Sequence, residues 1–386
     1  MTKQLSRYPI TNIWLKRLYD SQKGKKFSDF EFMKKFPDES SAYEYFKRIF
    51  WPFGPECPFC GSQYHYVRSD PKYLCCADCR KYYTLRTNTI LQKSRLPYLT
   101  WLYGLYVFVS TNGISSIQFA KRIGVTQKTA WFMLQRIRIA CGNPYFIYPL
   151  NDVVEIDESL VGGLEKNKHQ NKRLHGNWVD GKIPIVVVKD RKGNVHAFPV
   201  PKVNGENIHK LIKNYVSRGT SIYTDESYVY NGLSGRYRRM VVKHKLNEYV
   251  RGDVHTNGAE SFNSRMNKAF YATHHFFSRK HASSYANEIA FRQNKRKNKF
   301  GILGQINYLL ERAKKTRVTY NQLKQKTVQY YVYPKNTKYF FDKIRNGKQI
   351  LSPARYFENP FTPDELYSST HNSRAASSML WKTLKK

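Results

Sequence analysis

The sequence predicts an α/β protein, and three observations lead to that prediction. Short runs of β-branched and aliphatic residues, bounded by turn residues, recur after residue 150 and are typical of strands. Segments with apolar residues at three- and four-residue spacing alternate with them and indicate amphipathic helices. The chain has 386 residues, a length that exceeds the usual size of a single core, so two or more domains are expected. Apolar residues make up 41% of the chain, enough to form such cores.

The alternation is clearest after residue 150. Three strands are predicted first, followed by a helix over 205–217, further strands over 221–225 and 239–244, and helical sequence from His255 toward Arg317. This order is that of a ribonuclease-H-like domain, a mixed sheet with helices, whereas periodicity by itself supports only an α/β fold. The first three strands carry the sequences VVEID, IPIVVVKD and NVHAFPV.

Changes in composition divide the chain into predicted segments. The sequence before the α/β region has helical signals, one helix beginning at Asp38 or Ser40, and a stretch rich in cysteine. The last stretch is basic and rich in Tyr and Phe, and we assign it no role. The predicted segments are a helical segment at 1–50, a cysteine module at 51–92, a helical region at 93–145, the α/β domain at 150–317 and the basic extension at 318–386.

The charge of the chain indicates its class of partner. Lys and Arg number 66 against 28 Asp and Glu, a formal net charge of +38, which favours a polyanion and nucleic acid first. A membrane surface would require a basic amphipathic helix or a lipid anchor, and the sequence shows neither. The N-terminus lacks the apolar core of a secretory signal, and the hydrophobic stretch 96–109 is too short to span a bilayer. We expect a cytoplasmic protein, with 96–109 a buried helix opened by Pro97.

Five of the six cysteines lie between residues 57 and 79. Two Cys-x-x-Cys pairs, separated by 15 residues, have nearly the ligand spacing of a zinc ribbon. Four thiolates fill a tetrahedral shell, so the predicted Zn²⁺ is structural. Cys75 is not counted as a ligand, because using it in place of Cys76 would put three residues between the two cysteines of that pair. The predicted ligands are Cys57, Cys60, Cys76 and Cys79.

Basic residues follow the second cysteine pair directly. Arg80 and Lys81 suit contact with a DNA backbone, and a solvated hairpin would explain them equally well.

Two helices joined by a tight turn at Gly124 are predicted over residues 115–138. Thr126 would cap the second helix, with Ala130, Leu134 and Ile137 facing inward. In isolation an ordinary helical hairpin is as good an interpretation as a DNA-binding helix-turn-helix, but the neighbouring ribbon and the net charge favour DNA. The residues expected to face the major groove are Gln127, Lys128 and Thr129.

Three acidic residues lie at positions where a carboxylate is unusual. Asp157 lies inside an apolar strand, where a charge is costly unless it is paired or binds metal. Asp225 ends another strand, and Glu260 lies near the start of a helix. Each has a plainer explanation: the aspartates could be strand-end residues, and Glu260 could complete a capping box with Asn257. Together they favour a site for divalent metal.

These residues resemble those of a known family, the bacterial insertion-sequence DDE transposases with an N-terminal zinc ribbon, which are related to Merlin transposons. The resemblance covers roughly residues 38–300. It depends on the cysteine pairs, the helix-turn-helix, and the motifs EIDESLVGG from Glu155, YTD ending at Asp225 and HTNGAE ending at Glu260. The segment from Gly162 to His169 is also similar to the family's.

The resemblance implies a ribonuclease-H-like fold and a catalytic triad of Asp157, Asp225 and Glu260 that binds Mg²⁺, or Mn²⁺ in its place. Lys268, eight residues after Glu260, matches a basic position of the family, although it could be one more solvated lysine. The implied reaction is metal-dependent cleavage and transfer of DNA strands. The implied partners are double-stranded DNA, as terminal inverted repeats and as target, and further copies of the chain.

Two other functions agree with the same residues. One is a non-catalytic DNA-binding regulator descended from such an enzyme, and the other is a structure-selective nuclease that cuts without joining. The implied location is the bacterial cytoplasm, at the nucleoid.

Overall fold

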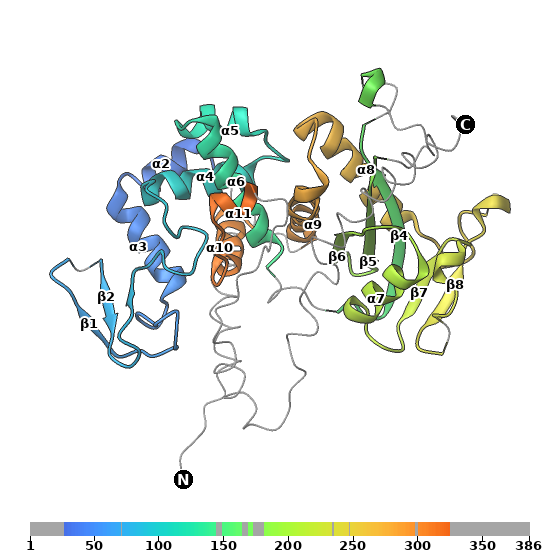
Figure 1. Cartoon of the computed structure of the whole chain (residues 1–386), viewed down its shortest axis with the longest axis horizontal. Coiled ribbons are helices and arrows are strands. Elements are labelled where there is room, and N and C mark those ends of the chain that lie inside the picture. The colour runs from blue at the N-terminus through green and yellow to red at the C-terminus, as the bar shows by residue number, and fades with distance from the viewer. Residues whose placement is uncertain are drawn as a thin grey trace, which may run out of the picture. The chain divides into compact units, whose positions relative to one another are not determined.

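A computed structural model describes residues 27–324, except residues 71, 144–148, 164–168, 173–180, 234, 247 and 298–299. Residues 1–26 of the predicted helical segment, most of the basic extension and part of the segment 162–169 therefore lie outside the described residues. By their internal contacts the described residues form two units, 27–143 with 295–319 and 149–294 with 320–324 (Figure 1). The predicted boundary of the α/β domain was residue 317, whereas residues 295–319 cluster with the first unit.

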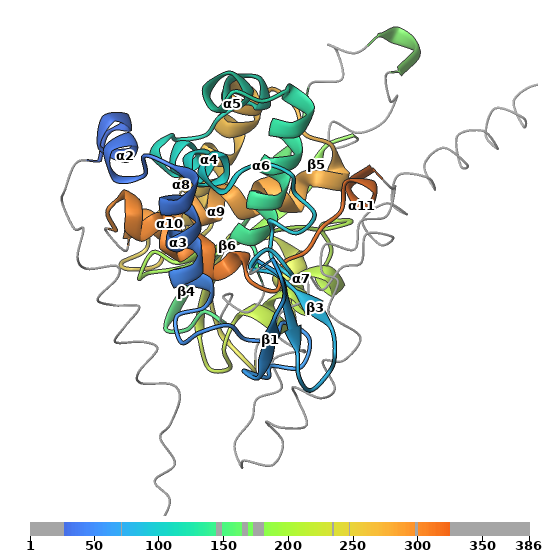
Figure 2. The same cartoon turned by 90° about the vertical axis from the view of Figure 1, so that its left-hand side faces the viewer.

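The first unit is mainly helical (Figure 2). The predicted helix start at Asp38 is confirmed, because its carboxylate caps α3. The buried helix after Pro97 is confirmed as α4, and Glu39 accepts hydrogen bonds from the backbone N–H groups of Tyr98 and Leu99, at 2.7 and 2.9 Å. The helices are α2 (Asp29–Lys35), α3 (Glu39–Phe50), α4 (Tyr98–Ser110), α5 (Ser116–Ile123), α6 (Gln127–Cys141) and α10 (Ile302–Ala313).

Helix α10 follows the α/β segment in sequence but packs against α3, α4 and α6. Asn143, just after α6, fixes this arrangement by donating through its side-chain amide to the carbonyl oxygens of Arg312 and Lys314. Among the described helices, none combines the length and the apolar character that crossing a bilayer requires.

The cysteine module is an antiparallel sheet of three short strands, β1 (His65–Val67), β2 (Leu74–Cys76) and β3 (Tyr82–Tyr83). Alternate residues of these strands face opposite sides of the sheet. Leu74, Cys76 and Tyr83 are buried on one side, together with Cys57 and against Trp51.

The second unit contains a mixed five-stranded sheet of order β6-β5-β4-β7-β8. Strand β4 pairs antiparallel with β5 and parallel with β7, so the first and fourth strands are neighbours, as a ribonuclease-H-like sheet requires. This confirms the predicted fold. The strands are β4 (Val153–Val161), β5 (Ile183–Asp190), β6 (Val195–Pro199), β7 (Ser221–Thr224) and β8 (Arg238–Val241).

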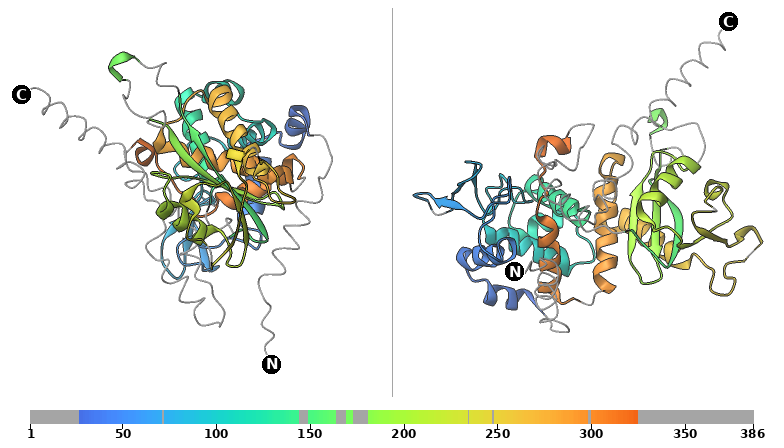
Figure 3. Two further views of the ribbon diagram at one scale, coloured as in Figure 1. Left: turned by 90° about the vertical axis from the view of Figure 1, so that its right-hand side faces the viewer. Right: turned by 90° about the horizontal axis from the view of Figure 1, so that it is seen from below.

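Helices cover both faces of this sheet (Figure 3). Helix α7 (Gly205–Tyr215) packs on the face that carries Val154 and Ile156. Helices α8 (Asn257–Lys268) and α9 (Ala282–Lys297) pack on the other face, which Val161 shares. Strand β5 is apolar from Ile183 to Val188 because both faces of this part of the strand are buried.

Shorter elements complete the second unit. They are the 3-10 turns η3 (Gln170–Lys172), η4 (Tyr228–Tyr230), η5 (His244–Leu246) and η7 (Arg279–His281), the π-helical segment η6 (Ala269–His274) and helix α11 (Tyr320–Lys324).

Candidate functional site

The register of the sheet places the two predicted aspartates at one level. In the parallel pair of β4 and β7, Val153 lies beside Ser221 and Glu155 beside Tyr223. Continued by two residues, the same offset sets Asp157 beside Asp225, the residue that follows β7. Because side chains alternate along a strand, Asp157 shares the face of Glu155 and Val161, which α8 covers.

Two hydrogen bonds hold the Asp157 carboxylate. The backbone N–H of Glu158 donates to its Oδ1 at 2.9 Å, and the side-chain amide of Asn263 on α8 donates to its Oδ2 at 2.8 Å. Asn263 is buried, and its own Oδ1 has no hydrogen-bond partner among the described residues. No sequence pattern singles out Asn263, which lies one helical turn beyond Glu260.

The electrostatics of this carboxylate suit a cation. Burial, helped by the negative charges of Glu260 and Asp225, raises the pKa of Asp157 to about 6, although the two hydrogen bonds favour the charged form. The three acids therefore lie close enough to repel one another. A divalent ion would replace that repulsion by attraction, so the donor set fits Mg²⁺.

The acids are not drawn together as tightly as the cysteines described below. Among the described residues, the four cysteines are the group of His, Cys, Asp or Glu side chains whose ligand atoms lie close enough together to hold one metal ion. Asp157 therefore lies near enough to Asp225 and Glu260 for their charges to interact. The three carboxylates do not converge on one point as the four sulfur atoms do.

The loop that carries Asp225 is fixed by an arginine of β8. Arg239 donates to the carbonyl oxygens of Asp225 and Ser227, both at 3.1 Å, and to the hydroxyl of Thr224 at 3.1 Å. The backbone N–H of Ser227 donates to Asp225 Oδ1. Among the described residues, none forms a hydrogen bond with the second carboxylate oxygen of Asp225.

Glu260 is not part of a capping box. Helix α8 begins after Thr256, and Glu260 is its fourth residue, whereas a capping box uses the third. Its carboxylate instead accepts a hydrogen bond from the hydroxyl of Thr256 at 2.7 Å and lies 3.8 Å from His244 Nε2. The side chain remains 43% exposed, so it is open to an incoming group.

A second carboxylate on β4 fixes the start of α8. Glu155 is buried, accepts a hydrogen bond from the backbone N–H of Ala259 at 2.9 Å, and forms an ion pair with Arg191 at 3.1 Å. A Cβ at Gly258 would lie 2.6 Å from Glu155 Oε2 and 2.5 Å from Lys189 Nζ. The glycine of HTNGAE is therefore needed for close approach of the helix to these charges.

Two hydrogen bonds join strand β4 to helix α8. Glu155 contacts residue 259 and Asp157 contacts residue 263. Two strand residues span about 6.6 Å and four helix residues about 6 Å, so both contacts form without distortion. Glu260 lies between them. A signal for Glu155 existed in the sequence, since it is the second carboxylate on the same face of an apolar strand.

The acids adjoining the two aspartates have other partners. Tyr230 donates its hydroxyl to Glu158, and burial raises the pKa of Glu158 to about 7. Glu226 accepts a hydrogen bond from the backbone N–H of His244 at 2.9 Å and so holds the turn η5. Lys268 is exposed at the end of α8, and no contact of its side chain links it to the three acids.

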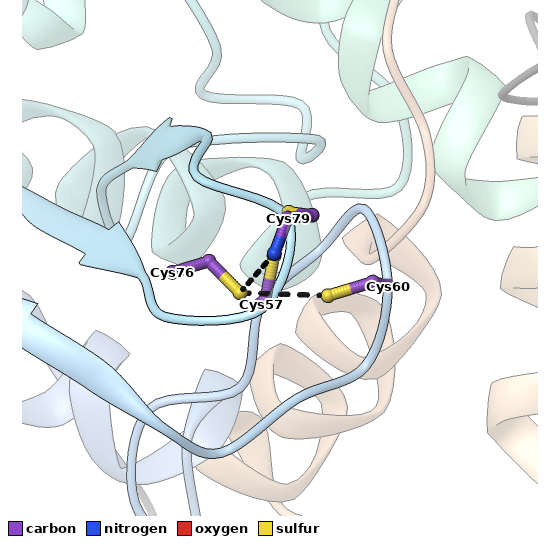
Figure 4. A group of neighbouring side chains, drawn as sticks. All are labelled: Cys57, Cys60, Cys76 and Cys79. Atoms are coloured by element: carbon purple, nitrogen blue, oxygen red, sulfur yellow. Dashed lines mark hydrogen bonds between the residues drawn. The ribbon is translucent and has the colours of Figure 1, made fainter.

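The four predicted zinc ligands converge (Figure 4). Their sulfur atoms all lie within 4.8 Å of one another, with 3.6 Å between Cys57 and Cys79 and 3.5 Å between Cys60 and Cys76. Cys75 lies on the opposite side of β2, and its sulfur is near the carbonyl oxygens of Cys76 and Arg80, which confirms its exclusion. A soft, closed set of four thiols fits structural Zn²⁺.

The two cysteine pairs end in the same backbone conformation. Gly61 follows the first pair with φ of 79°, and Arg80 follows the second with φ of 57°. Their N–H groups donate back to the carbonyl oxygens of Cys57 and Cys76. Arg80 and Lys81 are both exposed. Arg80 thus has the left-handed conformation that Gly61 has in the turn after the first cysteine pair.

The helix-turn-helix has the predicted geometry. Gly124 has φ of 69° between α5 and α6, and the Thr126 hydroxyl accepts from the N–H of Thr129. Ala130, Leu134 and Ile137 are buried. At the exposed start of α6, Gln127 and Lys128 face solvent and Thr129 is half-buried.

The rest of α6 is fixed within the unit. Arg136 donates to the carbonyl oxygens of Ile90 and Gln92 at 2.8 and 2.9 Å, at the end of the cysteine module. The amino end of α6 is therefore the exposed part of this helix.

Comparison with known proteins agrees with this arrangement. Residues 149–294 match the family model of the ISXO2-like transposase domain, and residues 37–82 match that of the transposase zinc-ribbon domain. The first match ends at residue 294, where the second structural unit also ends. An uncharacterized protein in transposable element ISH50 of Halobacterium salinarum is 29% identical over 245 residues, covering 59% of this chain and 82% of the relative.

Proposed function

Because residues 149–294 are an ISXO2-like transposase domain and residues 37–82 a transposase zinc ribbon, we propose that the chain binds the terminal inverted repeats of an insertion sequence and cleaves and joins DNA strands there. The observation that supports catalysis is that the charges of Asp225 and Glu260 act on the carboxylate of Asp157. Asp157 lies in β4, Asp225 directly follows the adjacent strand β7, and Glu260 lies in α8, which covers β4.

The proposed chemistry is hydrolysis followed by transesterification. Asp157, Asp225 and Glu260 would hold Mg²⁺ or Mn²⁺, and the bound ion would lower the pKa of a nucleophilic water or hydroxyl and stabilise the leaving oxygen. Asn263 and the N–H of Glu158 orient the Asp157 carboxylate, and Arg239 orients the loop of Asp225. His244, beside Glu260, is placed to donate a proton or to neutralise charge on that carboxylate. Lys268 is proposed to contact the DNA that enters this site.

Recognition of DNA is assigned to the first unit. The start of α6, with Gln127, Lys128 and Thr129, is proposed to enter the major groove, while Arg80 and Lys81 bind phosphates. Because two element ends must be joined, the working form is proposed to be an oligomer. We place it in the cytoplasm, at the nucleoid.

The decisive experiment is strand transfer with a labelled, pre-cut terminal-repeat end. We expect joining by the wild-type protein, and loss of cleavage and joining with near-normal end binding in Asp157→Asn, Asp225→Asn and Glu260→Gln. Asp152→Asn is the matched control, since Asp152 is an exposed acid just before β4 whose contact is a 3.8 Å pair with Lys192.

The outcomes separate the candidate functions. Retained activity in any triad variant would remove that residue from the site. Cutting without joining by the wild-type protein would assign a nuclease, and binding alone would assign a regulator.

A further inference from the structure

The sheet of the zinc ribbon has a face that the proposed function does not use. Tyr66 on β1 and Tyr82 on β3 both lie opposite Cys75 of β2, so their side chains share one side of the sheet. Arg68 and Tyr73 continue the same ladder, since the N–H of Arg68 donates to the carbonyl of Tyr73 at 3.2 Å. We call Tyr66, Tyr73, Tyr82 and Arg68 the tyrosine face.

The rings of this face are open to solvent. Tyr66 is 57% exposed, Tyr73 52% and Tyr82 58%, whereas Tyr83, the next residue on the other side, is 1% exposed. The buried side packs on the cysteines and Trp51. One side of the ribbon's sheet therefore forms its core, and the other side leaves three large rings in water, where a partner that covers them would gain free energy.

The chemistry of the tyrosine face selects the partner. The Arg68 guanidinium lies 5.3 Å from the centre of the Tyr82 ring, so a cation and a ring are already arranged side by side. Lys72, Arg80 and Lys81 are exposed on the same ribbon, together with Asp70 and Asp78, in a chain of net charge +38. Flat rings beside cations match a polymer that has aromatic faces and a phosphate backbone.

We propose that the tyrosine face of the zinc ribbon binds unpaired bases of DNA by stacking. In a duplex the base faces are covered by their neighbours, so rings can stack only on bases that have left the helix. A small sheet that offers aromatic side chains to splayed bases is an established way to bind single strands. The binding needs neither strand cleavage nor the acids of the second unit, so its test is independent of the proposed catalysis.

The test measures binding of the full, zinc-loaded chain to a labelled single-stranded oligo-deoxythymidine and to an abasic oligonucleotide of equal length. Tyr66→Ala with Tyr82→Ala should weaken binding to the first at least about tenfold and leave binding to the second unchanged, because stacking requires bases. Tyr66→Phe with Tyr82→Phe should keep wild-type affinity, since the ring remains.

The matched control is Val67→Ala, a residue 61% exposed on the other side of β1, which should leave both affinities unchanged. Bound zinc is measured in each variant. If the alanine pair loses zinc, the Tyr66→Trp and Tyr82→Trp pair decides: equal or tighter binding to the base-bearing strand supports stacking.

Three results would overturn the proposal. They are equal affinity of the zinc-loaded alanine pair and wild type for oligo-deoxythymidine, an equal loss on the abasic strand, and unchanged DNA binding with altered self-association. The last would assign the tyrosine face to a second copy of the chain.

Discussion

The carboxylate of Glu155 accepts a hydrogen bond from the backbone N–H of Ala259, the residue before Glu260. A buried charge on β4 therefore sets where the helix with the third acid begins. Glu155 also pairs with Arg191 and lies near His255, so it is held from two elements. The proposed active site thus depends on an acid that is not itself a proposed metal ligand.

Glu155→Gln should slow strand cleavage about tenfold or more while end binding stays near normal. The amide still accepts from Ala259 but no longer pairs with Arg191, so we also expect a loss of about 1–3 kcal/mol in the free energy of unfolding. Single-turnover cleavage and urea denaturation measure the two effects. A rate equal to that of wild type would show that Glu155 does not position Glu260.

Gly258→Ala should have the same effect through steric contact. The added Cβ meets Glu155 Oε2 and Lys189 Nζ at 2.6 and 2.5 Å, so the ends of both side chains must shift. Gly205→Ala is the matched control, because a Cβ at that helix start meets its nearest atom at an ordinary 3.5 Å. In a Glu155→Ala background the cost of Gly258→Ala should shrink, since the side chain that the new Cβ meets is then absent. Additive losses would contradict the shared mechanism.

The response to Mg²⁺ should depend on pH. Burial raises the pKa of Asp157 from 3.8 to about 6, so the metal-free folded protein binds this proton more tightly than the unfolded chain does and loses stability as pH rises from about 4 through 6. Mg²⁺ binds the ionised carboxylate, so its stabilising effect should grow over the same range.

Melting temperatures with and without Mg²⁺, at pH 5 and pH 7.5, measure this effect. The difference should be larger at the higher pH, and Asp157→Asn should remove most of that increase. A difference that is independent of pH would exclude Asp157 as a metal ligand.

Arg80→Gly should separate backbone fit from DNA contact. Glycine adopts the φ of 57° without strain, so stability should stay equal or rise by about 0.5–1 kcal/mol. Loss of the cation should weaken binding to a terminal-repeat duplex and reduce its salt dependence. Undiminished affinity and salt slope would remove Arg80 from the proposed DNA contacts.

Removal of zinc should unfold the ribbon. Cys57→Ser with Cys60→Ser should lose the metal and weaken end binding, because the four thiols close the small sheet. Cys75→Ser is the control and should retain zinc, since its sulfur lies outside the cluster. Elemental analysis of the purified variants decides, and undiminished zinc in the double variant would refute the ligand set.

Much of the fold follows from local patterns. The apolar runs of β4 and β7, the capped α6 and the cysteine pairs each have a signal within a few residues, and the structure has them as predicted. The positions of Asp157, within β4, and Asp225, directly after β7, follow from the apolar runs that carry them. The surroundings of Glu260 do not, because Thr256 and His244 reach it through turns whose course local sequence does not determine.

Long-range contacts account for the features of the structure that the sequence did not predict. Helix α10 has the apolar periodicity of any surface helix, and nothing in its sequence says that it packs on α3, α4 and α6 instead of continuing the α/β domain. Asn263 was missed for a similar reason, since an asparagine on a helix is usually solvated and only the nearness of β4 makes it a donor to Asp157.

The return of α10 makes the second unit an insertion within the helical unit. The chain leaves that unit after Asn143 and re-enters it at residue 295, so two covalent connections join the parts. A fragment that stops at residue 143 would lack α10 and expose the apolar sides of α3, α4 and α6. The natural way to isolate the helical unit is therefore to excise the middle of the gene and close the gap with a short linker.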